Sequence, residues 1–133
     1  MAVSHLDGAR VVLVVDDEPA VLKLMDRTLL DAGYMVRTAS GALPALLLLY
    51  TLDPSPAAVI TDLRMDPLDG ANLARIIREY WPGIPVLFVT GYAPDGQYGH
   101  LPGPVLTKPF DPEDLTEAVS RLIRDPSAER LSS

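Results

Sequence analysis

The sequence contains no cysteine and only two histidines, His5 and His100, among its 133 residues. The lack of cysteine excludes disulfide scaffolds, cysteine-ligated metals and thiol nucleophiles, and two histidines so far apart do not suggest a histidine-ligated site. No apolar run reaches the roughly 18 residues that a membrane span requires. The first ten residues also lack the charged-then-apolar order of a signal peptide. We therefore expect a cytoplasmic protein without a membrane segment.

Basic residues are also few: 11 Lys and Arg stand against 18 Asp and Glu, which gives a net charge of −7. This balance argues against non-specific binding to nucleic acid or to anionic membranes, so we expect no DNA binding by the chain itself. With 48% hydrophobic residues in 133 positions, the chain has enough apolar material for one packed domain. We expect a flexible lead-in at 1–10, the domain at 11–124 and a disordered tail at 125–133.

Short apolar runs alternate with segments of helical spacing along this domain. The runs predict strands near 11–15, 34–38, 57–61, 84–89 and 105–107, and the segments between them predict helices near 20–32, 41–51, 71–81 and 112–124. Such alternation indicates an α/β fold with a parallel sheet and helices on both faces. We expect a flavodoxin-like, doubly wound, five-stranded sheet in the order 2-1-3-4-5.

Three local signals refine this pattern. Gly33 is expected to end the first helix, and Ser40 to cap the second. Between the fourth and fifth strands, Tyr92 to Pro104 is dense in proline and glycine, which disrupts helical spacing. We therefore expect the fourth helix of the alternation to be short or absent.

Four consecutive leucines, Leu46 to Leu49, lie in the second predicted helix. Such a run covers more than one face of a helix. One interpretation places Ala45, Leu46 and Leu49 in the core and leaves Leu47 and Leu48 partly exposed. The alternative is an apolar surface patch for a partner.

Acids stand where two of the buried strands end. Asp16 and Asp17 follow the first strand, and Asp62 ends the third. The carboxyl ends of these strands meet at one edge of the sheet, where α/β proteins place their ligand sites. Two like charges about 4 Å apart repel by roughly 1 kcal/mol in water and by more in a cleft, so such a group favours a cation. Oxygen ligands suit Mg²⁺. We predict a Mg²⁺ site here, with Asp62 as a nucleophile that accepts a phosphoryl group.

Two further strand ends supply groups that suit an anion. Lys108 follows the last strand and Thr90 ends the fourth. An ammonium binds phosphate oxygens as a point charge, and a hydroxyl donates a hydrogen bond to them. Pro109 is compatible with a cis peptide bond. Each residue alone would more commonly be an ordinary surface group, as the acids would be loop acids or a helix cap. Together at successive strand ends they favour a site.

The set resembles the motifs of response-regulator receiver domains. It consists of Asp16-Asp17, Asp62, Thr90-Gly91 and Lys108-Pro109-Phe110, and the resemblance covers about residues 10–124. It implies that Asp62 takes a phosphoryl group from a histidine of a partner sensor kinase or phosphotransfer protein.

The resemblance also implies a role for each site residue. Asp17, Asp62 and the main-chain carbonyl of Arg64 would bind Mg²⁺ directly, and Asp16 would act through water. In the same way, Lys108 and Thr90 would hold the phosphoryl oxygens, and Thr90 would move its loop on phosphorylation.

The sequence departs from the family pattern at two points that concern signalling. Val105 occupies the position where many members carry an aromatic switch residue, and the fourth helix is degenerate, as in receivers of single-domain regulators and hybrid kinases. We therefore expect the loop from Thr90 to Pro104, including Gly91 and Tyr92, to carry the signal. Arg64 and Tyr92 would flank the phosphoryl group and slow its hydrolysis.

Three functions remain open from the sequence. The first is a phosphorylatable receiver without an output domain, present as a monomer or weak dimer. The second is a binding module that uses the same fold without phosphorylation. The third is a small-molecule phosphatase, which usually carries a second acid two residues after its nucleophile, where this chain has Arg64.

Overall fold

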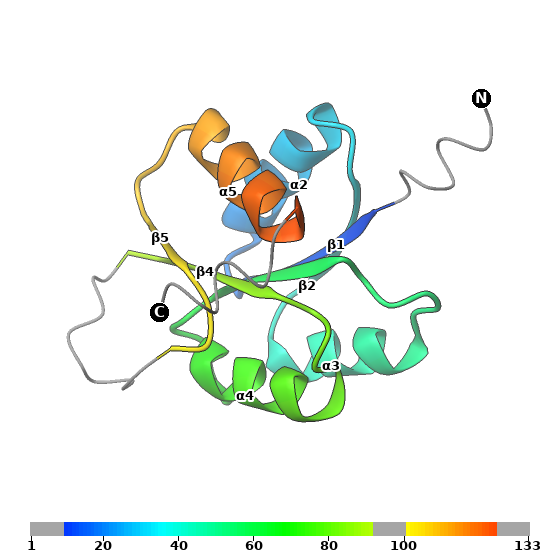
Figure 1. Cartoon of the computed structure of the whole chain (residues 1–133). Coiled ribbons are helices and arrows are strands. Elements are labelled where there is room, and N and C mark those ends of the chain that lie inside the picture. The colour runs from blue at the N-terminus through cyan, green and yellow to red at the C-terminus, as the bar shows by residue number, and fades with distance from the viewer. Residues whose placement is uncertain (1–9, 92–100, 125–133) are drawn as a thin grey trace.

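The computed structural model describes residues 10–91 and 101–124, and nothing is stated of the structure of the others. Within this part, strands and helices alternate along the chain (Figure 1). The strands are β1 (Val11–Val15), β2 (Met35–Ala39), β3 (Ala58–Asp62), β4 (Val86–Thr90) and β5 (Val105–Thr107). The helices are α2 (Pro19–Asp31), α3 (Ala42–Thr51), α4 (Gly70–Tyr80) and α5 (Pro112–Arg124).

The five strands form one parallel sheet in the order β2-β1-β3-β4-β5, which confirms the predicted topology. In the register of the central strands, Val15 lies beside Thr61, and Asp62 lies beside Val89. The carboxyl ends of β1, β3 and β4 are therefore level with one another. Since the third strand includes Asp62 rather than ending before it, this acid is held by the sheet itself.

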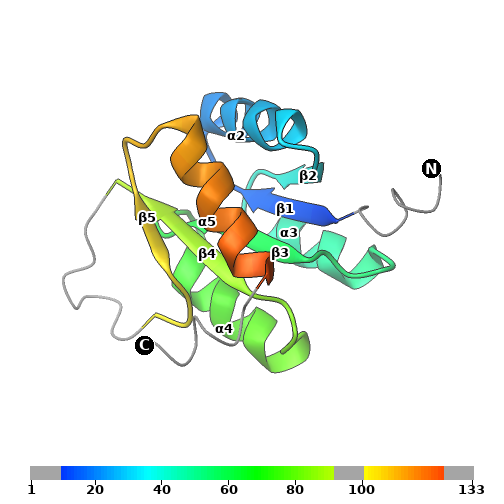
Figure 2. The ribbon, with the colours of Figure 1, turned by 45° about the horizontal axis from the view of Figure 1, so that its top comes forward.

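Helices cover both faces of the sheet. Figures 1 and 2 show α2 and α5 on one face and α3 and α4 on the other. Alternate residues of β1 point to the two layers: Val12 and Val14 pack with α2 and α5, whereas Leu13 and Val15 pack with α3 and α4. A strand covered on both sides must be apolar at every position, which explains the unbroken hydrophobic runs of the sequence.

The ends of the helices partly match their sequence signals. Gly33 has a φ of +100° just after α2, a conformation that glycine adopts without strain. Asp69 caps α4 by accepting a hydrogen bond from the Asn72 N–H (2.8 Å). The prediction for Ser40 is wrong: Gly41 occupies the N-cap of α3 and no side chain caps that helix. The chain reaches α3 through extended backbone one residue later than the sequence suggests.

The four leucines of α3 divide between core and surface. Leu49 is buried with Ala45, Leu46 and Leu48 are half-buried, and Leu47 is 66% exposed. On α4, helical spacing predicts one inward face of Leu73, Ile76, Ile77 and Tyr80. Leu73 and Ile77 are buried and Ile76 is half-buried, but Tyr80 is 69% exposed. Both helices therefore carry more apolar surface than the sheet covers.

The predicted loss of the fourth helix concerns mainly residues 92–100, which lie outside the described residues, as do 1–9 and 125–133 of the predicted lead-in and tail. In the described part of this segment, Gly103 lies against β4. A Cβ atom at this position would clash with the Val86 carbonyl oxygen. None of the described helices is long and apolar enough to cross a membrane.

Candidate functional site

Four neighbouring strands deliver the predicted site residues to one edge of the sheet. Asp16 directly follows β1, Asp62 ends β3, Thr90 ends β4, and Lys108 follows β5. Two backbone hydrogen bonds extend the strand pairing to these residues: the Asp16 N–H donates to the Ala39 carbonyl (3.2 Å), and the Lys108 N–H to the Thr90 carbonyl (2.8 Å). The backbone of each site residue is therefore fixed by the sheet.

Lys108 lies close to two of the three acids. Its Nζ is 3.5 Å from Asp62 Oδ2 and 3.6 Å from Asp16 Oδ2. Because β4 lies between β5 and β3 in the sheet, the lysine side chain crosses one strand to reach Asp62, and Asp16 lies one strand further, after β1. The Lys108–Pro109 peptide bond is cis.

The three carboxylates form one cluster of unequal exposure. Their oxygen atoms lie within 4.8 Å of one another. Asp16 is fully buried, Asp62 is 8% exposed, and Asp17 is exposed. The cluster is thus open to solvent on the side of Asp17, and a small ligand can approach Asp62 from there.

Asp16 is the acid of the cluster that is fully buried. Its Oδ1 accepts a hydrogen bond from the Glu18 N–H (2.9 Å), but its buried Oδ2 has no hydrogen-bond partner. Burial raises the pKa of Asp16, and the charges of Asp62 and Asp17 raise it further; the hydrogen bond from Glu18 and the charge of Lys108 oppose the rise.

This arrangement fits a hard divalent cation. Three carboxylates face one ammonium, so negative charge remains in excess, and the buried Asp16 Oδ2 lacks a hydrogen-bond partner. Oxygen atoms of this kind are the usual ligands of Mg²⁺. The Arg64 N–H donates to Asp62 Oδ1 (3.3 Å), which holds the loop after β3 against the acid. The role of the Arg64 carbonyl as a ligand stays a prediction.

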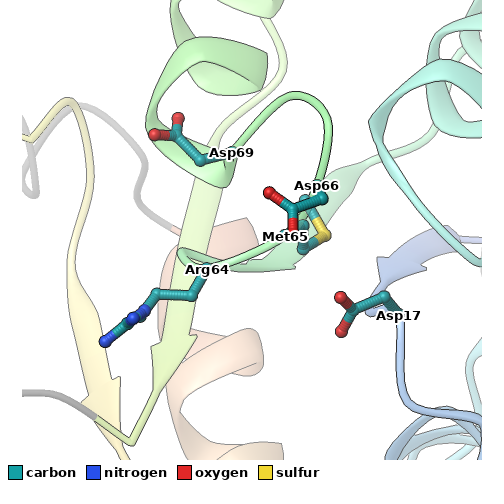
Figure 3. Close-up of a pocket in the computed structure, with 5 residues that line it drawn as sticks. All are labelled: Asp17, Arg64, Met65, Asp66 and Asp69. Carbon is teal, nitrogen blue, oxygen red and sulfur yellow. The ribbon is translucent and has the colours of Figure 1, made fainter.

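A cavity of about 390 Å³ adjoins the cluster. Figure 3 shows the five residues that line it: Asp17, Arg64, Met65, Asp66 and Asp69. The Arg64 side chain extends away from Asp17 and Asp66, so the cavity is bordered mainly by acids (Figure 3). Asp66 and Asp69 were not among the predicted site residues. The sequence signal that could have indicated these two acids is their position in the loop between β3 and α4, directly after Asp62.

The predicted signalling residues differ in how far the structure places them. Thr90 is fully buried at the end of β4, and Gly91 after it is exposed. Val105 is partly buried and packs against the core layer of α3 and α4. Tyr92 lies outside the described residues. The side chain of Val105 is aliphatic, so it has no ring that could rotate between two positions.

Gly70 is a site-forming residue that the sequence did not single out. Its N–H donates to the Leu63 carbonyl (2.8 Å), and a Cβ atom here would clash with the Asp62 carbonyl oxygen. The first turn of α4 therefore lies directly against the backbone of the central acid. The Asp-Gly pair before the helix was a signal for a turn, but it did not indicate this contact.

The fold and the site together define a class of protein: an α/β protein that carries an acid cluster and a lysine at the switch point of a flavodoxin-like sheet. The sequence model of the response regulator receiver domain matches residues 12–120. The chain belongs to this family, which functions in two-component signalling.

Individual relatives agree with this assignment. The chain is 34% identical over 124 residues to the sensor kinase CckA of Brucella abortus, covering 90% of the chain but 13% of that protein. A receiver domain from Clostridium thermocellum has a similar structure, with a TM-score of 0.81, 28% identity and coverage of 90% of this chain and 98% of the other. The regulator TrrA of Thermotoga maritima, solved in complex with Mg²⁺-BeF, has a TM-score of 0.77, 27% identity and coverage of 85% and 98%.

Proposed function

We propose that Asp62 accepts a phosphoryl group from a phosphohistidine of a partner sensor kinase or histidine phosphotransfer protein. The observation that carries this proposal is the position of the Asp62 carboxylate. It stands at the end of β3, in one cluster with the buried Asp16 and the exposed Asp17, and the Lys108 ammonium is 3.5 Å away. Membership of the receiver family and likeness to the CckA sensor kinase support it.

In the proposed transfer, an Asp62 carboxylate oxygen attacks the phosphorus atom. The new P–O bond forms as the P–N bond to the histidine breaks, and the electron pair of that bond stays on the imidazole nitrogen, which takes up a proton. Such transfers rely on positioning and on neutralising charge rather than on covalent chemistry by the protein. The sheet supplies the positioning, because Asp62 belongs to β3.

The charge of the transferred group is met by this chain's own residues. In the order of the strands, Asp62 on β3 lies between Asp17, which follows β1, and Lys108, which follows β5. Lys108 offers its ammonium to phosphoryl oxygens. We assign the Thr90 hydroxyl to another of these oxygens. Asp16, Asp17, Asp62 and the Arg64 carbonyl are assigned to Mg²⁺, which would supply neutralisation of the developing negative charge. The related TrrA, solved with Mg²⁺-BeF, supports this metal.

The signal is assigned to the loop from Thr90 to Pro104. Engagement of the Thr90 hydroxyl would favour one position of this loop, including Gly91 and Tyr92, and would thereby change the surface offered to a partner. Val105 is partly buried against the core. We expect its side chain to keep one conformation and not to transmit the signal. We place this activity in the cytoplasm, which suits a chain without cysteine.

The test is incorporation of one phosphoryl group. The protein is incubated with acetyl phosphate and Mg²⁺, and its mass is measured intact and after proteolysis. We expect one added phosphoryl group, located at Asp62 and lost when EDTA replaces Mg²⁺. Asp62→Ala should remain unlabelled, whereas Asp66→Asn, which removes an exposed charge from the adjoining cavity, should be labelled normally.

A folded wild-type protein that stays unlabelled would contradict the proposal. The chain would then be a receiver-fold binding module. Labelling at a residue other than Asp62 would contradict the assignment of the nucleophile.

A further inference from the structure

The helices α3 and α4 lie on the face of the sheet opposite α2 and α5 (Figures 1 and 2). An apolar groove is lined by residues of these two helices. Its volume is about 720 Å³. Its lining includes Leu43, Leu47 and Tyr50 of α3, and Ile76, Tyr80 and Trp81 of α4 and its C-terminal end. Four of these side chains are exposed by more than half. None of them belongs to the phosphoacceptor site.

The helix α3 is the unusual element here. None of its ten residues carries a charge, and it has no polar face. A helix that is apolar on all sides is normally buried. In the described structure, only Ala42, Ala45 and Leu49 of α3 are fully buried. Its outer face is therefore suited to contact with another molecule.

We propose that this groove is a self-association surface, in which α3 and α4 of a second copy of the chain pack against it around a two-fold axis. In a two-fold interface the same patch serves both partners, so it must be complementary to itself. Exposed side chains of both helices, among them Leu43, Leu47 and Tyr80, line the groove, so one patch supplies the apolar contacts that each copy would offer to the other.

The charges of the molecule favour this occupant. Each copy has a net charge of −7, so most pairs of facing surfaces would repel. Contact through α3 brings no charge of that helix into the interface. The charged residues of α4 are Arg75, Arg78 and Glu79, all exposed, and they sum to one positive charge. The two helices around the groove therefore lack the negative excess of the chain as a whole.

The size of the patch agrees with a weak but specific dimer. The exposed parts of its side chains amount to roughly 600 Å², as large as the largest apolar patches of ordinary monomers. Two copies would then bury about 1,200 Å² in total, near the lower limit for specific interfaces. We therefore expect a dimer that forms reversibly with increasing concentration.

Sedimentation equilibrium of the unphosphorylated 133-residue chain, from about 1 µM to about 500 µM, tests the proposal. The expected result is a monomer–dimer equilibrium. Leu47→Glu should weaken association by roughly tenfold or more, because it buries a charge in the interface. Leu24→Glu is the matched control: Leu24 is also an exposed leucine (58%), but it lies on α2, on the opposite face, and the substitution should leave association unchanged.

Spin labels locate the interface independently. Because the chain has no cysteine, Thr51→Cys and Lys23→Cys each introduce a single labelling site, on α3 and α2 respectively. In the proposed dimer the two labels at position 51 should be closer together than those at position 23. Three results would each overturn the proposal. The first is a monomer at every concentration, which would indicate that the groove binds a different protein. The second is an equal effect of the two leucine substitutions on association, and the third is a shorter distance between the labels at position 23 than between those at position 51.

Discussion

At the scale of single residues, the acids of the site repel one another, and a bound cation would reduce this repulsion. Asp16 is buried close to two other acids, and its Oδ2 has no hydrogen-bond partner, although Lys108 Nζ lies 3.6 Å away. Removing its charge should therefore stabilise the metal-free protein while impairing the metal site. A gain in stability together with a loss of metal binding would identify Asp16 as an acid that serves the site, whereas an acid that serves the fold would lose stability when replaced.

We predict that Asp16→Asn raises the free energy of unfolding in EDTA by about 1–2 kcal/mol, because a neutral amide costs less to bury among carboxylates. An amide oxygen still accepts the hydrogen bond of the Glu18 N–H. Urea unfolding with and without Mg²⁺ measures both effects: the variant should be more stable in EDTA, and its gain on adding Mg²⁺ should be smaller than that of wild type. Asp66→Asn should change neither quantity appreciably.

The pH dependence follows from the same residue. The pKa of Asp16 is raised in the folded state, so the protonated folded form is favoured at low pH, and this contribution is lost as the pH rises through the folded pKa. The stability advantage of Asp16→Asn in EDTA should therefore grow as the pH increases from acid to neutral. A constant difference between the two proteins across that range would contradict it.

Arg64 provides a second prediction at this scale. It lies two residues after Asp62, and its backbone N–H contacts the Asp62 carboxylate. A bulky side chain at the rim would hinder the attacking water, so Arg64→Asn should speed the loss of the phosphoryl group, by roughly three- to tenfold. The decay of labelled protein, after removal of the phosphodonor, gives the rate. Arg75→Asn, on the outer side of α4, is the control, and an unchanged rate in Arg64→Asn would contradict the proposed hindrance.

At the scale of secondary-structure elements, the position of Asp62 depends on how closely α4 approaches β3. Gly70 permits this approach, since a Cβ atom would clash with the Asp62 carbonyl oxygen. Gly70→Ala should lower the free energy of unfolding by about 1–3 kcal/mol, as overpacking does, and should slow phosphorylation of Asp62.

Gly83→Ala is the matched control for this change, because nothing lies within 4 Å of a Cβ atom at Gly83. Chemical denaturation and phosphorylation rates would be measured for both variants. If Gly70→Ala behaves like Gly83→Ala, the contact between α4 and the backbone of Asp62 does not position the site.

These elements also show what the sequence could and could not predict. The strand-helix alternation was enough to predict the sheet order, and the shared edge of parallel strands was enough to bring Asp16, Asp62 and Lys108 together. The close contact of Gly70 was not predictable, since it depends on the distance between two elements rather than on local spacing. Similarly, helical periodicity placed Tyr80 inward, because periodicity gives the side of a helix but not the width of the surface that covers it.

At the scale of the whole molecule, the question is how a change at Asp62 reaches a partner. The sheet is packed on both faces, so its strands offer little freedom, and Val105 has no aromatic ring to turn. Thr90 links the site to the segment that follows, since it is buried at the end of β4 and its carbonyl accepts from the Lys108 N–H (2.8 Å). We therefore expect the path from the site to the surface to begin at the end of β4.

We predict that loading the site with Mg²⁺ and beryllofluoride, a mimic of the phosphoryl group, slows amide hydrogen exchange in residues 91–104 more than elsewhere on the surface. A ligand shifts an equilibrium only by interacting more favourably with one state than with the other, and we assign that difference to the Thr90 hydroxyl. Thr90→Val, which keeps the shape but removes the donor, should still bind beryllofluoride but lose the change in exchange. Equal exchange of 91–104 in loaded and unloaded wild type would show that the signal leaves by another route. The residues of α3 and α4 that line the apolar groove include neither Thr90 nor any acid of the cluster. Their exchange should remain the same in both states, so self-association through the groove should be independent of phosphorylation.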